Sequence, residues 1–275
     1  MAKHIKETDE DIINNHSPDH QIGLHFAFIV LLVIVLQGCA GNSHLVSYEV
    51  SGTQTQALLC KPEGAGPFPT VVYNHGRIVD EIGYTEASFR GYDIKGICEA
   101  LAADGFLVFA PIRQSGPGNI FGHKEEVNRT IDYMKNLPEV DPARIALMGF
   151  SRGGLLTLMV AVERTDLSAY LILAPAPGRW HFADAAQHIS SLSAPVLLLV
   201  EASDDNKILE DFEMLSQALK EKAKASQIMM YDRGGGHRLF WDVGYYWDDV
   251  RRFLQDNLAL PSPGLKKPIA SSKQR

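Results

Sequence analysis

A serine at position 151 stands in a pattern that can make it a nucleophile. Residues 149–153 read GFSRG and directly follow the apolar run 145–148. A tight turn from a strand into a helix holds its central residue in a strained conformation, and a side chain two positions away on either side would collide with that turn. The glycines at both of these positions therefore predict that Ser151 lies on such a turn with its hydroxyl exposed.

A serine hydroxyl becomes an effective nucleophile when an imidazole removes its proton during the attack. His237 follows the short apolar run 227–231 across a glycine-rich loop, and it is the candidate base. Asp204 and Asp205 follow the apolar run 196–200. A carboxylate bonded to the far ring nitrogen would orient the imidazole and stabilise its charged form. We assign that role to Asp204, with Asp205 as the alternative.

The spacing of apolar residues predicts the elements that position these groups. Short aliphatic runs alternate with helical stretches from Thr70 onward, and uninterrupted apolar strands are typical of a parallel sheet covered on both faces. The expected strands are 70–73, 106–110, 145–148, 170–173, 196–200 and 227–231, and the expected helices include 94–101, 127–137, 155–162, 211–223 and 245–258. Because ligands bind at the carboxyl ends of such strands, we expect Ser151, Asp204 and His237 to meet there.

Two further strands, 45–50 and 56–61, are separated by a turn-rich break and are expected to form an antiparallel hairpin at the sheet edge. Hydrophobic residues make up 45% of the chain, which is enough for one substantial core. We therefore expect one α/β domain over residues 45–258, with a mostly parallel sheet of about eight strands and helices on both faces. The segment 178–193 is expected to be a small lid near the active face.

The composition argues against several kinds of partner. Nucleic-acid binders carry a basic patch or stripe, whereas this chain has a formal net charge of −7 and scattered Lys and Arg. His123, His181 and His188 lack the spacing of a zinc site and are expected on the surface or in the lid. We therefore expect no nucleic-acid partner, no metal and no cofactor.

The first 38 residues differ from the rest of the chain. Residues 26–36 are uninterruptedly apolar, which is well short of the roughly 20 residues that span a bilayer as a helix but suits a signal peptide. The run ends in residues 36–40, LQGCA, which resemble the lipobox of bacterial lipoproteins. This resemblance implies removal of residues 1–38 and lipidation of Cys39. We expect an exported protein anchored to a bacterial membrane on its periplasmic or cell-surface side. A linker at 39–44 and a disordered tail at 259–275 are also expected.

Five segments, in the expected order, resemble an α/β-hydrolase of the dienelactone hydrolase type, a group close to the prolyl-oligopeptidase catalytic domain. They are 66–76 (GPFPTVVYNHG), 141–145 (DPARI), 149–153 (GFSRG), 201–204 (EASD) and 235–240 (GGHRLF). The resemblance covers about residues 45–258, implies the α/β-hydrolase fold, and favours Asp204 over Asp205 as the acid. It also implies an oxyanion hole formed by the backbone N–H groups of Arg152 and Arg77.

Bacterial dienelactone hydrolases proper use a cysteine nucleophile, so their substrate is not carried over to a chain with Ser151. We predict a serine hydrolase that cleaves an ester, thioester or lactone through an acyl-enzyme intermediate. A prolyl-oligopeptidase-like peptidase and a non-catalytic binding lipoprotein on the same fold are the alternatives.

Three arginines, Arg77, Arg113 and Arg152, are expected near the pocket and suggest a substrate with an anionic group, with Arg113 as a substrate-binding residue. The redox state of Cys60 and Cys98 and the oligomeric state are left open.

Overall fold

The apolar runs form an eight-stranded sheet in the computed structural model, which describes residues 42–50, 52–114, 116, 118–222 and 224–258. The strands are β1 (Asn42–Val50), β2 (Thr53–Lys61), β3 (Phe68–Asn74), β4 (Leu107–Ile112), β5 (Val140–Phe150), β6 (Ala169–Leu173), β7 (Val196–Glu201) and β8 (Ser226–Tyr231). Their order across the sheet is β1-β2-β4-β3-β5-β6-β7-β8. β2 pairs antiparallel with β1 and with β4, and the remaining neighbours are parallel. The expected edge hairpin and mostly parallel sheet are confirmed.

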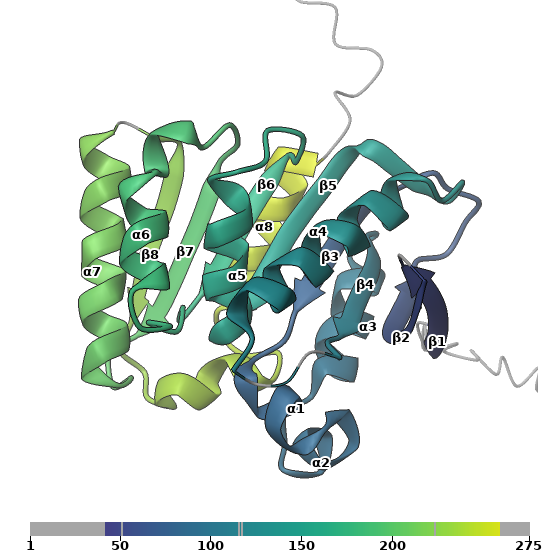
Figure 1. Ribbon diagram of the computed structural model, residues 1–275, viewed down its shortest axis with the longest axis horizontal. Helices are drawn as coiled ribbons and strands as arrows, with labels where there is room; N and C mark the ends of the chain where they lie inside the picture. The colour runs from purple at the N-terminus through teal and green to yellow at the C-terminus, as the bar shows by residue number, and fades with distance from the viewer. Residues whose placement is uncertain (1–41, 51, 115, 117, 223, 259–275) are drawn as a thin grey trace, which may run out of the picture. The chain divides into compact units, whose positions relative to one another are not determined.

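Helices cover both faces of this sheet, as expected. They are α1 (Arg77–Ile82), α2 (Tyr84–Phe89), α3 (Ile94–Ala103), α4 (Ile120–Lys135), α5 (Arg152–Ala161), α6 (His181–Gln187), α7 (Asn206–Glu221) and α8 (Trp247–Leu258), with the short 3₁₀-helices η1 (Ile189–Ser191) and η2 (Gly236–Trp241). Helices α4, α5, α6 and α7 pack side by side over one face, whereas α3 and α8 lie against the other (Figure 1).

The centre of the sheet is buried on both faces. Every residue of β6 and β7 is buried, and so is every residue of α5, which is apolar nearly all round. Close packing around a helix leaves its ends little freedom to move. Because α5 begins directly after Ser151, this burial fixes the turn that carries the candidate nucleophile.

A disulfide ties the antiparallel edge of the sheet to the helix that covers it. Cys60 of β2 and Cys98 of α3 are bonded, with their Cα atoms 5.8 Å apart. Both side chains are buried, and the bond closes 38 residues of sequence. The sequence alone left open whether these cysteines are paired.

Two features of the fold differ from the expectations. Helices α1 and α2 were not predicted, because each has six residues and the glycines that follow them, Gly83 and Gly91, interrupt any helical period. The expected lid over 178–193 instead forms α6 and η1. Phe182, Ala185 and Ala186 bury α6 between α5 and α7, so this segment belongs to the helix layer of the fold.

Several expectations concern residues that the structure does not describe. The signal peptide over 1–38, the lipidated Cys39 and the tail over 259–275 all lie outside the described ranges. Strand β1 already begins at Asn42, within the expected linker. Across the described ranges, the helices are too short or too polar to cross a membrane.

Candidate active site

Ser151 lies on the predicted sharp turn between β5 and α5. Its backbone has φ 55° and ψ −116°, a conformation that residues other than glycine rarely adopt. A Cβ at position 149 would lie 2.1 Å from the carbonyl oxygen of Gly153, and a Cβ at position 153 would lie 1.9 Å from the carbonyl oxygen of Asn74. Both glycines are therefore required by space, as the sequence pattern predicted.

Two cavities meet at Ser151. The larger, of about 570 Å³, lies toward the start of α4 and the loop before α6, and its walls include Ile120, Arg179 and His181. The smaller, of about 340 Å³, is lined by His237 and Trp241 as well as by Ser151. The candidate nucleophile and the candidate base thus face the same space.

Asp204 and His237 form the pair that the sequence predicted. Nδ1 of His237 lies 2.9 Å from Oδ2 of Asp204, whose side chain is fully buried. The ring of His237 also packs on Phe150, with ring centroids 4.6 Å apart. Asp205 instead accepts a hydrogen bond of 2.8 Å from the backbone N–H of Lys207 and caps α7. The structure therefore brings Asp204, and not Asp205, to the histidine.

A second buried carboxylate, Glu201, holds the loops that carry this pair, and sequence reasoning missed it. One of its oxygens accepts hydrogen bonds from the backbone N–H and hydroxyl of Ser203 and from the N–H of Gly236, and the other accepts from the N–H of Gly234. Residues 234–236 all have positive φ, which lets their N–H groups converge on the carboxylate. Burial alone would raise the pKa of Glu201, but these donors outweigh it and lower the pKa.

The loop after β3 carries Arg77, whose backbone N–H is the expected second oxyanion donor. The N–H of Gly76 donates a 2.9 Å hydrogen bond to the hydroxyl of Tyr92, so it is already engaged. Burial raises the pKa of Tyr92 to about 12, and this partner therefore stays protonated at neutral pH. The next residue, Arg77, begins α1 and lines both cavities beside Ser151. Arg152, which follows the serine, is the first residue of α5.

A buried ion pair lies behind this loop. Nε and one terminal nitrogen of Arg113 each lie 2.9 Å from an oxygen of Asp80, and both side chains are almost completely buried. The same terminal nitrogen of Arg113 donates a 2.8 Å hydrogen bond to the carbonyl of His75. Burial and the neighbouring Arg113 hold the pKa of His75 well below its usual range, so this ring is neutral. The ion pair therefore fixes the loop from which Arg77 projects.

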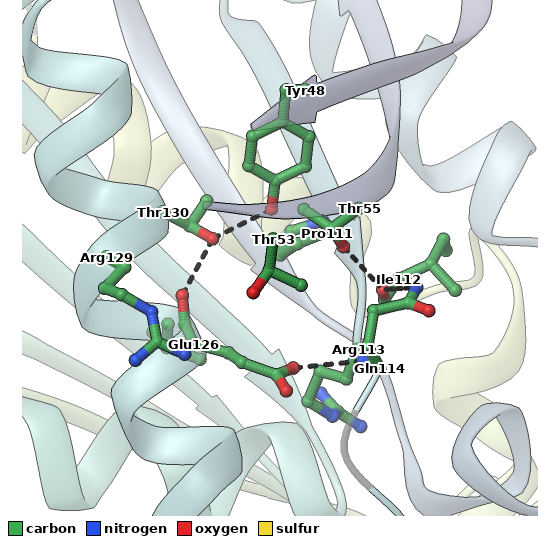
Figure 2. A pocket seen from close by; sticks show the side chains of 11 residues that line it. Tyr48, Thr53, Thr55, Pro111, Ile112, Arg113, Gln114, Glu126, Arg129 and Thr130 are labelled. Atoms are coloured by element: carbon green, nitrogen blue, oxygen red, sulfur yellow. Dashed lines mark hydrogen bonds between the residues drawn. The ribbon is translucent and has the colours of Figure 1, made fainter. Parts of the chain in front are cut away.

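The expectation that Arg113 binds substrate is wrong. Its side chain is 1% exposed and engaged with Asp80, and it does not line the cavities at Ser151. Figure 2 shows it beside a separate pocket of about 280 Å³ between the edge hairpin and α4, whose walls include Tyr48 and Glu126. The strand was predicted over 106–110 and is found as β4, which ends at Ile112, but the direction of the Arg113 side chain was not predicted.

The other arginines do border the larger cavity. Arg77 pairs with Glu81 at 2.6 Å, and Arg152 lies 3.8 Å from Asp80. Arg179, which the sequence analysis did not single out, is exposed at the same cavity. Among the described residues that line this cavity, three are arginines and none is acidic.

The histidines that were not expected to bind a metal lie in different parts of the fold. His123 is on α4, and its side chain is buried rather than on the surface. His181 lines the larger cavity. Within the residues that the structure describes, no group of three or more His, Cys, Asp or Glu side chains could hold a metal ion.

The sequence is similar to several known hydrolases. Residues 121–242 match the Dienelactone hydrolase family. The uncharacterized peptidase YtmA of Bacillus subtilis (strain 168) is 23% identical over 223 residues, which cover 68% of this chain and 83% of that protein. Cutinase 1 of Thermobifida cellulosilytica is 28% identical over 162 residues, which cover 55% of this chain and 57% of the cutinase. The chain thus spans little more than half the length of that cutinase.

Solved structures share the fold at low identity. A proposed dienelactone hydrolase from Klebsiella pneumoniae superposes with a TM-score of 0.64 and 20% identity, over 80% of this chain and 99% of that one. The acylaminoacyl peptidase of Pyrococcus horikoshii has a TM-score of 0.61 and 13% identity, over 82% of this chain and 43% of the peptidase. The chain therefore has the α/β-hydrolase fold, and its residues 121–242 are similar to the Dienelactone hydrolase family.

Proposed function

We propose that this protein is a serine esterase in which Ser151, His237 and Asp204 form the catalytic triad. The observation that carries the proposal is the 2.9 Å contact between His237 and the buried Asp204, together with the cavity that His237 and Ser151 both line. The relatedness to cutinases and to the Dienelactone hydrolase family supports cleavage of a carboxylic ester.

The geometry supports a two-step reaction. In the neutral ring, Nδ1–H of His237 donates to Asp204, which leaves Nε2 to accept the proton of Ser151 as its oxygen attacks the ester carbonyl. The carbonyl oxygen becomes negative and accepts hydrogen bonds from the N–H groups of Arg152 and Arg77. The bond to the alcohol then breaks, and His237 gives the alcohol its proton. Water, deprotonated by the same ring, releases the acid and restores Ser151.

Hydrolysis of a panel of small esters tests this assignment. We expect the wild type to hydrolyse at least one of these esters. The Ser151→Ala variant should lower kcat by at least about 10³-fold and keep the wild-type circular dichroism spectrum. The Ser190→Ala variant is the matched control, because this serine is exposed on η1 and lines neither cavity. Undiminished hydrolysis by folded Ser151→Ala would refute the proposal.

A peptidase is the second candidate, because the similar proteins include YtmA and acylaminoacyl peptidase. The same triad can cleave an amide, which differs in needing a protonated amine as leaving group. Parallel assays with peptide anilides and with esters of the same acyl group separate the two activities. Cleavage of the anilides without ester turnover would reverse our ranking.

The arginines of the larger cavity support a preference for esters that carry an anionic group. Arg77 and Arg179 are the exposed guanidinium groups there, and Arg113 takes no part. Because guanidinium groups bind carboxylates strongly, we expect Arg179→Ala to lower kcat/KM for a hemisuccinate ester more than for the matching neutral ester. Equal effects on both esters would remove this part of the proposal.

We also propose that the protein is exported and anchored through lipidated Cys39. The support is the sequence LQGCA around this cysteine and the disulfide between Cys60 and Cys98, since disulfides persist in oxidising compartments. Metabolic labelling with an alkyne fatty acid should mark the wild-type protein and not the Cys39→Ser variant. Equal labelling of both proteins, or labelling of neither, would contradict the anchor.

A further inference from the structure

Two large aromatic side chains stand exposed beside the cavity of Ser151. Phe121 of α4 and Trp180 of the loop before α6 are 52% and 57% exposed, and their ring centroids lie 6.0 Å apart. Both rings contact His181, at centroid distances of 4.9 Å and 4.1 Å. His181 lines the cavity, so the three rings form an aromatic cluster beside it, which we call the aromatic rim.

The packing of the fold does not require this rim to be aromatic. Phe182, two residues after Trp180, is buried and anchors α6 in the helix layer, whereas Trp180 lies outside that layer. On α4, Val127 and Ile131 face the core while Phe121 remains exposed. Large apolar surface left in water costs free energy, and exposed apolar clusters commonly mark binding sites. The rim is therefore available to a ligand.

The chemistry of the rim favours a flat ring as its partner. Aromatic rings gain attraction from edge-to-face and offset stacking beyond the area that they bury. The ring of His181 adds to this surface because burial lowers its pKa, which favours the neutral form. Its Nδ1 is buried and has no hydrogen-bond partner.

The positions of the two cavities around Ser151 indicate where the alcohol part and the acyl part of an ester would bind. The imidazole that protonates the leaving alcohol lies in the smaller cavity, so the alcohol part must occupy that side. The acyl part then extends into the larger cavity, past Arg152 and toward His181. Its volume of about 570 Å³ is within the range of small-molecule sites.

We propose that the substrates are esters of aryl-bearing carboxylic acids, whose aryl group stacks on Phe121, Trp180 and His181 while the ester carbonyl lies at Ser151. This inference rests on the proposed serine esterase function and names its acyl specificity.

Methyl phenylpropanoate and methyl cyclohexylpropanoate test the proposal, because the two acyl groups have the same length and differ in aromaticity. We expect the wild-type kcat/KM to be about tenfold higher for the phenyl ester, in line with the strength of aromatic pairs. Trp180→Leu and Phe121→Leu, which keep an apolar side chain, should each reduce this ratio toward one. Phe89→Leu, at a residue that is 88% exposed and lines neither cavity, should leave it unchanged.

A binding measurement separates this proposal from the esterase assignment. Titration of the Ser151→Ala variant with the two free acids, followed by nuclear magnetic resonance, reads the aromatic rim without turnover. Tighter binding of phenylpropanoate that is lost when Trp180→Leu is added to Ser151→Ala supports the aromatic rim. Absence of ester hydrolysis by the wild type would refute the esterase assignment and leave this binding result standing. Equal binding of both acids, or equal kcat/KM for both esters in the wild type, overturns the aryl specificity.

Discussion

Replacement of Glu201 by glutamine should weaken both the fold and the candidate site. The carboxylate accepts four hydrogen bonds, three on one oxygen and one on the other. A glutamine can place its single oxygen on the side with three donors, but its NH₂ group then faces the N–H of Gly234. One buried donor is left without a partner, at about 1–3 kcal/mol, and three bonds lose their charge assistance. We expect the free energy of unfolding to fall by about 4 kcal/mol.

The same change should affect turnover through His237, which directly follows the glycine loop that Glu201 holds. A displacement of about 1 Å in a catalytic group costs about 100-fold in rate, so we expect kcat to fall by about 10- to 100-fold with little change in KM. Urea denaturation and ester kinetics measure the two effects. Glu213→Gln, at an exposed position on α7, is the matched control.

The effect of Glu201 on stability should depend on pH. Its pKa is lower in the folded protein than its ordinary value of 4.5, so the ionised carboxylate stabilises the fold above pH 4.5. This contribution is lost as the pH falls through the folded pKa. The difference in stability between wild type and Glu201→Gln should therefore shrink in acid. A variant within about 1 kcal/mol of wild type at pH 7, with full kcat, would refute the reasoning.

Three further outcomes follow from the contacts described. Arg113→Ala leaves a buried carboxylate without its partner and should cost about 3–5 kcal/mol in urea denaturation, and a loss below about 1 kcal/mol would mean that the pair is open in solution. Replacing Cys60 and Cys98 by alanine should cost about 4 kcal/mol for a span of 38 residues, whereas unchanged stability would indicate free thiols. Asp204→Asn should lower kcat by about 10⁴-fold, while Asp205→Ala should cost about 1 kcal/mol of stability and no activity. The reverse pattern would exchange the two roles.

The sequence predicted the strands and Ser151 because those features depend on local patterns. Uninterrupted apolar runs are distinctive of buried parallel strands, and the glycines at positions 149 and 153 leave few alternatives to a sharp turn. The pairing of His237 with a carboxylate was predictable because both follow neighbouring parallel strands, β7 and β8.

Side-chain direction limited the rest of the prediction. Arg113 directly follows β4, a strand that was predicted, but only the three-dimensional packing shows that its side chain turns toward Asp80. Glu201 was missed because a carboxylate at a strand end has the same sequence pattern whether it is solvated or buried. The bond between Cys60 and Cys98 depends on α3 packing across β2, which the periodicity of either element does not specify.

We propose that Ser151 is the residue acylated during turnover. The most direct measurement is intact-protein mass spectrometry after reaction with an alkyl fluorophosphonate, followed by peptide mapping. We predict one adduct per chain, located on Ser151, and none on folded Ser151→Ala protein. An adduct on another residue, or an inactivated enzyme in which Ser151 stays unmodified, would contradict the role of Ser151 as the nucleophile.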